Sequence, residues 1–135
     1  MLQSISMTKI ILKPGREKSV KNHHPWLFSG SIKNIEGDPS NGDIVEVFAD
    51  GGAFLARGFY NANSKMIVRL FSFNEADTID VVFWKERIEQ ALQLRTMLID
   101  QKSTNAFRII HGEGDFLPGL VVDKYNEHCV VQFST

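Results

Sequence analysis

The sequence predicts an α+β fold in which a small β-barrel is followed by a small α/β domain with strands around one helix. Two observations lead to this prediction. Up to residue 73, short apolar runs alternate with turn clusters, which is typical of short strands. From Asp80 the apolar residues recur at steps of three and four, which is typical of a helix. We place the boundary within 74–78, which gives domains of residues 1–73 and 74–135.

The first domain contains five predicted strands and one short helix. The run "KIILKPG" (9–15) is a strand that ends at a Pro-Gly turn. Pro25 excludes a regular helix through the segment that follows, so we expect one or two helical turns from Arg16 to about Asn22. The other four strands are Ser31–Ile35, Ile44–Phe48, Phe54–Tyr60 and Met66–Phe73. Strands this short and evenly spaced usually close into a barrel, because closure removes exposed edges.

The second domain begins with one amphipathic helix, from Asp80 to about Lys102, whose first turn either Asp80 or Thr78 can cap. Its apolar stripe comprises Val81, Trp84, Ile88, Ala91, Leu92, Leu98 and Ile99. Arg95 interrupts this stripe. Its side chain either extends along the stripe to water or pairs with a carboxylate of a neighbouring segment.

Three strand-like runs follow the helix. They are "FRIIHGEGD", "LPGLVVDKYN" and "HCVVQFST", and turns are expected at Gly112–Asp115 and Asn126–Glu127. The last run is apolar and β-branched, and nothing follows that would continue or cover it. We therefore expect this chain to be a fragment of a larger unit.

The composition is that of a soluble globular protein, with 43% hydrophobic and 23% charged residues. No stretch approaches the roughly 18 apolar residues that cross a bilayer, and the N-terminus lacks the features of a signal peptide. Cys129 is the only cysteine, which excludes an internal disulfide and a zinc site made of several cysteines. We expect a cytoplasmic protein without a membrane partner.

The charge is unevenly distributed along the chain. Residues 1–73 carry 9 basic and 6 acidic side chains, a net charge of +3, whereas the remaining 62 residues carry 6 basic and 10 acidic side chains, a net charge of −4. The first domain therefore presents either an anion-binding face or an ordinary solvated surface.

One cationic element stands out in the first domain. Lys13, Arg16, Lys18 and Lys21 lie on the predicted turn and short helix, opposed only by Glu17. Such an element can present several charges to a phosphate backbone, and the alternative is a merely soluble helix face. Further candidates for phosphate contact are His24, Arg57 and Arg69.

The glycine-acid run "GEGDFLPG" resembles a cofactor loop at first sight. Gly112 and Gly114 fit the first two positions of a G-x-G-x-x-G fingerprint, but Leu117 occupies the third and a strand follows instead of a helix. This excludes a phosphate-binding loop. Glu113 and Asp115 could act as an acid–base pair, but a turn needs acceptors for its own amides, and we favour that interpretation.

Three other candidate sites have a simpler structural interpretation. His23 and His24 are adjacent, so their side chains diverge and form a poor metal pair. Trp26 and Phe28 could stack on bases, but aromatics beside a proline in a small barrel are more often core residues, which we favour. Cys129 lies in an apolar strand pattern, which predicts a buried, inert thiol.

Taken together, "LKPGREKSVKNHHPWLFSGSI", "GDIVEVFADGGAFLARGFYN" and "FRIIHGEGDFLPGLVVDKY" resemble the N-terminal part of the PUA-domain ribosomal RNA methyltransferases, which methylate cytosine C5 in large-subunit RNA with S-adenosylmethionine (SAM). The resemblance covers nearly the whole chain from Lys9. The sequence departs from the family at Phe116, where the family usually has glycine.

The resemblance implies a PUA-like RNA-binding domain in residues 1–73 and part of an α/β connecting domain in 74–135, with the Rossmann-like catalytic domain absent from these residues. For the intact protein it implies SAM as cofactor, ribosomal RNA as partner and a possible homodimer. No catalytic, cofactor or metal residue is carried over, and the fragment alone is expected to be inactive. The alternative is a protein–protein or homodimerisation module without direct RNA contact.

Overall fold

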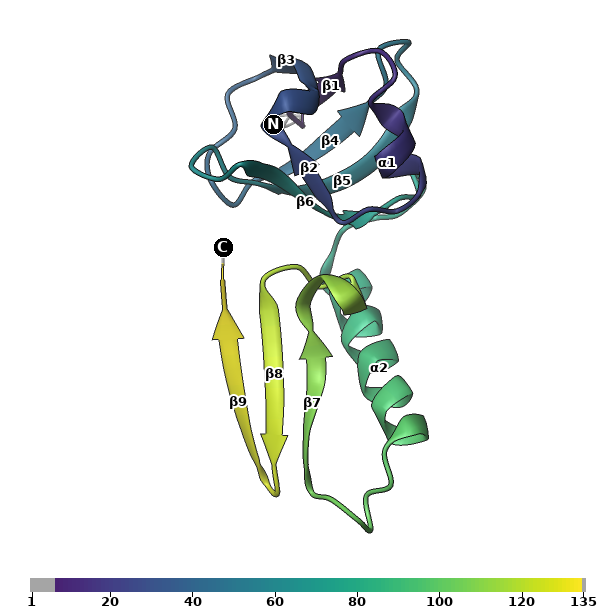
Figure 1. Ribbon diagram of the computed structural model, residues 1–135, viewed down its shortest axis with the longest axis vertical. Coiled ribbons are helices and arrows are strands. Elements are labelled where there is room, and N and C mark those ends of the chain that lie inside the picture. The colour runs from purple at the N-terminus through teal and green to yellow at the C-terminus, as the bar shows by residue number, and fades with distance from the viewer. Residues whose placement is uncertain (1–6, 135) are drawn as a thin grey trace, which may run out of the picture. The chain divides into compact units, whose positions relative to one another are not determined.

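The computed structural model describes residues 7–134, which form two compact units. The first unit ends at Glu75 and the second begins at Ala76, so the division falls inside the 74–78 segment. The predicted β-rich half and the predicted helix-and-strand half each correspond to one unit (Figure 1). Residues 1–6 of the predicted first domain and Thr135 of the second lie outside the described residues.

The first unit contains the five predicted strands, the predicted short helix and one further strand (Figure 1). Its elements are β1 (Lys9–Leu12), α1 (Glu17–Lys21), β2 (Trp26–Phe28), the 3-10 turn η1 (Ser29–Ser31), β3 (Ile32–Glu36), β4 (Ile44–Phe48), β5 (Phe54–Tyr60) and β6 (Met66–Ser72). Strand β2 was not predicted, because three residues after Pro25 are too few to show a period of two. It pairs antiparallel with β6.

The six strands form one curled sheet in the order β2-β6-β5-β4-β1-β3. Strand β1 pairs parallel with β4 and antiparallel with β3, and the other pairs are antiparallel. Strands β2 and β3 are the two ends of this order, and η1 joins them in sequence. The backbone N–H of Lys13 donates to the carbonyl of Ser31 at 2.9 Å. The expected barrel is thus a sheet that curls on itself without a strand pair between its ends.

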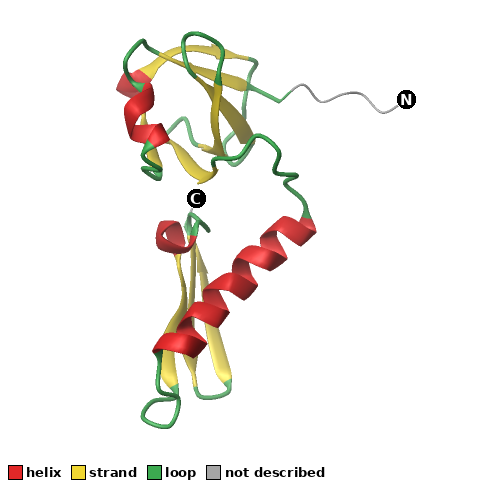
Figure 2. Ribbon diagram, turned by 90° about the vertical axis from the view of Figure 1, so that its right-hand side faces the viewer, coloured by secondary structure: helices red, strands yellow, loops and turns green. Residues whose placement is uncertain are grey.

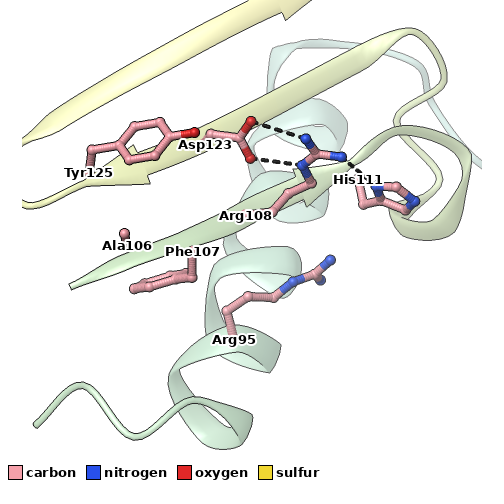
Figure 3. A pocket seen from close by; sticks show the side chains of 7 residues that line it. All are labelled: Arg95, Ala106, Phe107, Arg108, His111, Asp123 and Tyr125. Atoms are coloured by element: carbon pink, nitrogen blue, oxygen red, sulfur yellow. Dashed lines mark hydrogen bonds and ion pairs between the residues drawn. The ribbon is translucent and has the colours of Figure 1, made fainter. Parts of the chain in front are cut away.

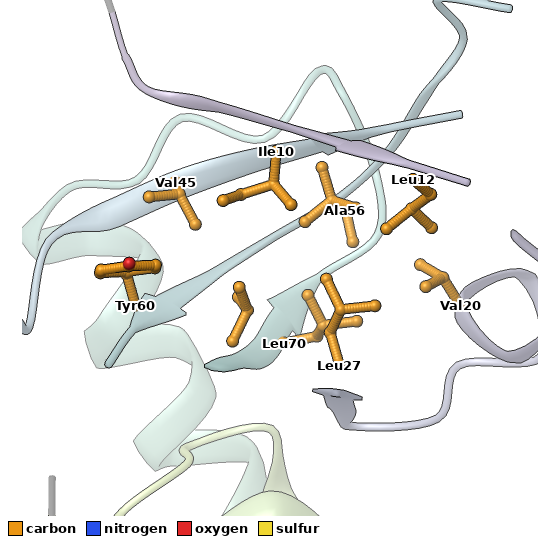
Figure 4. Packing of buried hydrophobic residues seen from close by; sticks show 10 residues of the cluster. Ile10, Leu12, Val20, Leu27, Val45, Ala56, Tyr60 and Leu70 are labelled. Carbon is orange, nitrogen blue, oxygen red and sulfur yellow. The ribbon is translucent and has the colours of Figure 1, made fainter. Parts of the chain in front are cut away.

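The core of the first unit lies inside this curl and receives one or two side chains from nearly every element (Figure 4). Its fully buried members include Ile10, Leu12, Val20, Leu27, Val45, Val47, Ala56, Val68 and Leu70. Because α1 contributes Val20, the short helix is held against the sheet although five residues alone would not form a stable helix.

Gly58 lies where β5 and β6 approach each other closely. A Cβ atom added there would lie 2.5 Å from the carbonyl oxygen of Arg69 and 2.5 Å from a methyl carbon of Val68. We expect Gly58→Ala to force these strands apart and lower the free energy of unfolding by about 1–3 kcal/mol. Urea titration measures this loss. Gly30→Ala is the control, because an added Cβ there meets nothing within 4 Å; equal losses in the two variants would contradict the prediction.

The second unit contains α2 (Val81–Leu98), β7 (Ala106–His111), the 3-10 turn η2 (Gly112–Asp115), β8 (Leu120–Tyr125) and β9 (His128–Phe133). The strands form an antiparallel sheet in the order β7-β8-β9, and α2 packs on β7 (Figure 2). Asp80 caps α2 by accepting from the backbone N–H of Phe83 at 2.9 Å, which confirms one of the two expected caps.

Helix α2 ends at Leu98, earlier than predicted. The backbone of Ile99 is extended, and the Asp100 carboxylate accepts from the backbone N–H of Lys102 at 3.0 Å and from the hydroxyl of Ser103 at 2.6 Å. These bonds stabilise a turn that competes with the helix. No helix within residues 7–134 is both long and apolar enough to span a bilayer.

Much of the apolar surface of the second unit is exposed. Ala91 is the buried residue of α2, and it packs with Ile110 and Leu117, whereas Val81 is 82% and Leu98 73% exposed. All of β9 is exposed, including Cys129, so the predicted burial of that thiol is wrong. The physical reason is that α2 packs on β7 and β9 pairs only with β8 among the described strands.

Candidate nucleic-acid interface

The four cations predicted on the turn and short helix all lie on the surface of the first unit. Lys13, Arg16, Lys18 and Lys21, which we call the α1 cation set, are exposed, whereas the opposing Glu17 is partly buried. Val20 faces the core at 1% exposure. Because one buried side chain fixes the helix on the sheet, its charged side chains are directed to solvent. The structure therefore leaves these groups accessible to an anion, and their contact with phosphate remains a prediction.

Lys13 links the α1 cation set to the end of β2. Its ammonium group donates to the carbonyl of Gly30 at 3.0 Å. Gly30 lies in η1, directly after β2, so this cation lies beside the last residues of that strand. The α1 cation set therefore lies beside β2 at the Phe28 end of the strand. Residues 22–25 also connect α1 to the start of β2 in sequence.

Three aromatic rings lie on the surface at β2: those of Trp26 and Phe28 on the strand, and that of His24 just before it. We call these the β2 aromatic set. Trp26 is 37% and Phe28 46% exposed, whereas Leu27 between them is 1% exposed. The core interpretation of the two aromatics is therefore wrong. Residues alternate across a strand, so burying Leu27 directs both neighbours outward.

The two adjacent histidines diverge, as predicted. His23 has a left-handed backbone (φ 59°), and its ring stacks on Phe73 with the centroids 4.3 Å apart. His24 instead makes an edge contact with Trp26 at 6.0 Å, and its Nδ1 lies 3.2 Å from the backbone N of Trp26. Among residues 7–134, no three His, Cys, Asp or Glu side chains are grouped to hold a metal ion.

Arg57 requires a correction, because it is buried at 7% exposure. Its guanidinium donates to the Glu46 carboxylate at 3.1 Å and to the carbonyls of Asn74 and Glu75, each at 3.1 Å. These bonds occupy all three nitrogens, so Arg57 is removed from the candidate phosphate contacts. Arg69 is partly buried and lies directly across from Trp26 in the β2–β6 pair, so it remains a candidate.

The "GEGDFLPG" segment is a turn, as predicted. Its backbone is closed by the Leu117 N–H, which donates to the Gly112 carbonyl at 3.0 Å, and Leu117 itself is 5% exposed. Phe116 adopts a left-handed backbone (φ 56°), a conformation that glycine adopts more readily than other residues. Its ring lies 5.2 Å from the Arg87 guanidinium, and burial lowers the pKa of Arg87.

Asp115 has a structural partner. Its carboxylate accepts from both terminal nitrogens of Arg95, at 2.5 and 2.8 Å, and from the backbone N–H of His111 at 2.6 Å. Of the two alternatives for Arg95, pairing with a carboxylate is thus confirmed. Because three hydrogen bonds hold this buried carboxylate, the structure favours the turn interpretation over acid–base catalysis with Glu113.

A pocket of about 610 Å³ in the second unit is lined in part by Arg95 (Figure 3). Arg108 donates to both Asp123 oxygens, at 2.7 and 3.1 Å, and its other terminal nitrogen lies 3.2 Å from Nδ1 of His111 (Figure 3). The hydrogen bonds from Arg108 lower the pKa of Asp123, and the same pairing raises the pKa of Arg108. Since both arginines that line this pocket are paired with carboxylates, we place the anion-binding candidate on the first unit.

The first unit matches a known family. Residues 10–73 match the family described as PUA-like domain, and the observed sheet has the PUA-like half-barrel architecture. Most of the chain is also similar to part of longer proteins. It is 44% identical over 124 residues to the ribosomal RNA large subunit methyltransferase I of Alteromonas mediterranea and 41% identical over 123 residues to that of Pseudoalteromonas translucida.

These alignments cover 92% and 91% of this chain but only 31% of either relative, so the chain spans about a third of the length of the relatives it matches. Two solved structures share its fold. A candidate SAM-dependent methyltransferase from Streptococcus mutans superposes with a TM-score of 0.79 over 96% of this chain and 34% of its own. A candidate methyltransferase in complex with SAH superposes with a TM-score of 0.80 over 96% and 33%. Both are 20% identical to this chain.

Proposed function

We propose that this chain is the RNA-binding part of a SAM-dependent methyltransferase that acts on cytosine C5 of 23S ribosomal RNA in the cytoplasm. The strongest support is the α1 cation set, four exposed basic side chains on one anchored element of a PUA-like domain. We take large-subunit ribosomal RNA as the substrate from the names of the relatives. We take cytosine C5 as the methylated atom from the resemblance of the sequence motifs.

The α1 cation set binds the phosphate backbone rather than base edges in this proposal. Lysine and arginine that neutralise phosphates release condensed counterions, so affinity from such contacts depends on salt and not on sequence. Arg16 adds a planar group that can bind one phosphate through two hydrogen bonds, whereas the lysines act as point charges. His24 and Arg69 extend the contact along β2.

Methyl transfer is assigned to the rest of the protein. The loop from Gly112 to Gly119 does not fit SAM, because buried Leu117 stands where the fingerprint has its third glycine and because the loop leads into β8. We therefore propose that SAM is bound outside these residues, that the chain alone is inactive, and that its contribution is to hold the RNA.

The double variant Arg16→Ala with Lys18→Ala tests the proposal. Because two phosphate contacts are lost, we expect the slope of log affinity against log salt to become shallower by about 1.4–1.8. The loss should be similar for RNAs of unrelated sequence. Filter binding over a salt series measures both. The control is Lys85→Ala with Lys102→Ala, which removes the same charge from the second unit; an equal loss in this control, or a slope that does not change, would contradict the assignment.

A homodimerisation module without direct RNA contact is the second candidate. It is favoured by the exposed apolar side chains of α2 and β9, among which Val81, Met97 and Phe133 are 82%, 83% and 78% exposed. Light scattering on the same samples separates the two functions. A dimer that shows no salt-dependent binding to any RNA would support this second candidate.

A further inference from the structure

We infer that Trp26 and Phe28 stack on unpaired nucleobases, so that the RNA presents a loop or single strand, rather than continuous duplex, to β2. This inference rests on the proposed RNA binding, because it concerns the same face of the first unit. Beyond that function, the inference specifies that the RNA is unpaired where it is bound and that Trp26 and Phe28 recognise it.

The backbone of β2 fixes both rings on the outer face of the sheet. The strand pairs with β6 on one side only and ends the hydrogen-bonded order, so nothing in the sheet continues beyond it. Leu27 is buried, and the pairing shifts register between Leu27 and Phe28. A register shift can re-aim the side chain that follows it, and here Phe28 is 46% exposed.

Large aromatic side chains on a surface are a marker of interaction sites. Trp26 and Phe28 do not stand alone, because the His24 ring lies 6.0 Å from the first and 6.5 Å from the second. The Nδ1 atom of His24 lies 3.2 Å from the backbone N and 3.1 Å from the backbone O of Trp26. The ring is thereby held beside the strand, so the β2 aromatic set forms one surface that is organised before a ligand binds.

Cations border the β2 aromatic set. Arg69 is the cross-strand partner of Trp26, and directly opposed residues of an antiparallel pair point to the same face. Near Phe28, the Ser29 N–H donates to the carbonyl of Lys65, and the ammonium group of Lys13 donates to Gly30. Aromatic rings interleaved with basic side chains are the usual composition of surfaces that bind single-stranded nucleic acid.

Carboxylates are absent from this part of the sequence. No aspartate or glutamate occurs between Glu17 and Glu36, or between Asp50 and Glu75. Strands β2, β5 and β6 and the second half of α1 therefore carry no negative side chain. This charge pattern complements a polyanion. It therefore favours RNA as the partner over a protein whose surface carries charges of both signs. In a duplex the base faces are already stacked on one another, so the rings would find no partner there.

Trp26 fluorescence provides the test. The chain contains two tryptophans, so Trp84→Phe leaves Trp26 as the single reporter. Two RNAs of equal length serve as probes, a hairpin with a large unpaired loop and a fully paired duplex. We expect the loop RNA to quench Trp26 and to bind more tightly than the duplex. Filter binding, which needs no tryptophan, measures the affinities of the variants. Trp26→Ala or Phe28→Ala should weaken loop binding about 5- to 150-fold, the usual range for base–aromatic stacking, without changing duplex binding or the salt slope.

The conservative variant Trp26→Phe should retain most of the preference for the loop, because it keeps an aromatic face. Phe133→Ala, which removes a ring that is 78% exposed on the second unit, should leave both affinities unchanged. Equal affinity for the two RNAs with unchanged Trp26 fluorescence would overturn the stacking inference and leave the proposed function in place. Salt-independent or undetectable binding of both RNAs would overturn the proposed function itself.

Discussion

Replacing Asp115 with alanine is expected to lower the free energy of unfolding of the second unit by about 3–5 kcal/mol, the usual cost of removing one partner of a buried ion pair. The side chains of Asp115 and Arg95 are 6% and 16% exposed. The variant would leave the Arg95 guanidinium without its carboxylate and the His111 N–H without its acceptor. The larger part of the loss comes from the Arg95–Asp115 bonds, which are partly buried, because the His111 N–H lies where water can replace the lost acceptor.

Urea titration of a Trp26→Phe background measures the effect, because Trp84 then reports on the second unit alone. The matched control is Asp123→Ala. Asp123 forms the same two-bond contact with an arginine, but Arg108 is 45% exposed, so we expect a far smaller loss. The double variant Arg95→Met with Asp115→Leu should recover most of the stability, since apolar groups can replace a buried pair at little cost. Equal losses for Asp115→Ala and Asp123→Ala would contradict this account.

The Arg95–Asp115 pair shows where sequence analysis reaches its limit. The sequence places an arginine inside an apolar helix stripe and an aspartate inside a glycine turn, and each has two reasonable interpretations. Only the three-dimensional arrangement of α2 and η2 shows that the two side chains meet. A local pattern can predict that a charge is unusual, but its partner is a long-range property.

Most strands were predictable because their signals are local. Five of the six strands in the first unit are flanked by turn residues that can be recognised in the sequence. Strand β2 has three residues and follows a proline, so its period was too short to be detected. That omission also caused the wrong core assignment of Trp26 and Phe28, because recognising a strand with Leu27 facing inward would have placed both neighbours outside.

Burial was less predictable than secondary structure. The structure buries little of the predicted apolar stripe of α2: Val81 and Leu98 are mostly exposed, and Ala91 is the buried residue of the helix. Amphipathic spacing indicates which side of a helix can be covered, but the exposed fraction depends on what packs there. The same reason explains Cys129, whose strand β9 pairs only with β8 among the described strands.

Arg57 illustrates the same point for a charged residue, and it leads to the second large effect. We expect Arg57→Met to destabilise the first unit by about 3–5 kcal/mol, because it leaves Glu46 without its partner in a nearly buried position. The side chains of this pair are 8% and 18% exposed, and the closest nitrogen and oxygen are 2.9 Å apart. Urea titration in the Trp84→Phe background, where Trp26 reports, measures the loss.

The control for charge removal is Lys33→Met. Lys33 pairs with Asp50 on the surface, where its side chain is 54% exposed, so a loss of about 0–1 kcal/mol is expected. If Arg57→Met lost as little stability as Lys33→Met, the predicted contribution of the buried pair would be wrong.

Arg57 also fixes the chain as it leaves the first unit. Its bonds to the carbonyls of Asn74 and Glu75 hold the two residues that end that unit. We therefore expect Arg57→Met to accelerate cleavage after Glu75 by a glutamate-specific protease, under conditions where the unit remains folded, whereas Lys33→Met does not. RNA affinity of the folded variant should stay unchanged, because a buried guanidinium cannot reach phosphate. Reduced RNA affinity without faster cleavage would instead return Arg57 to the RNA contacts predicted from sequence.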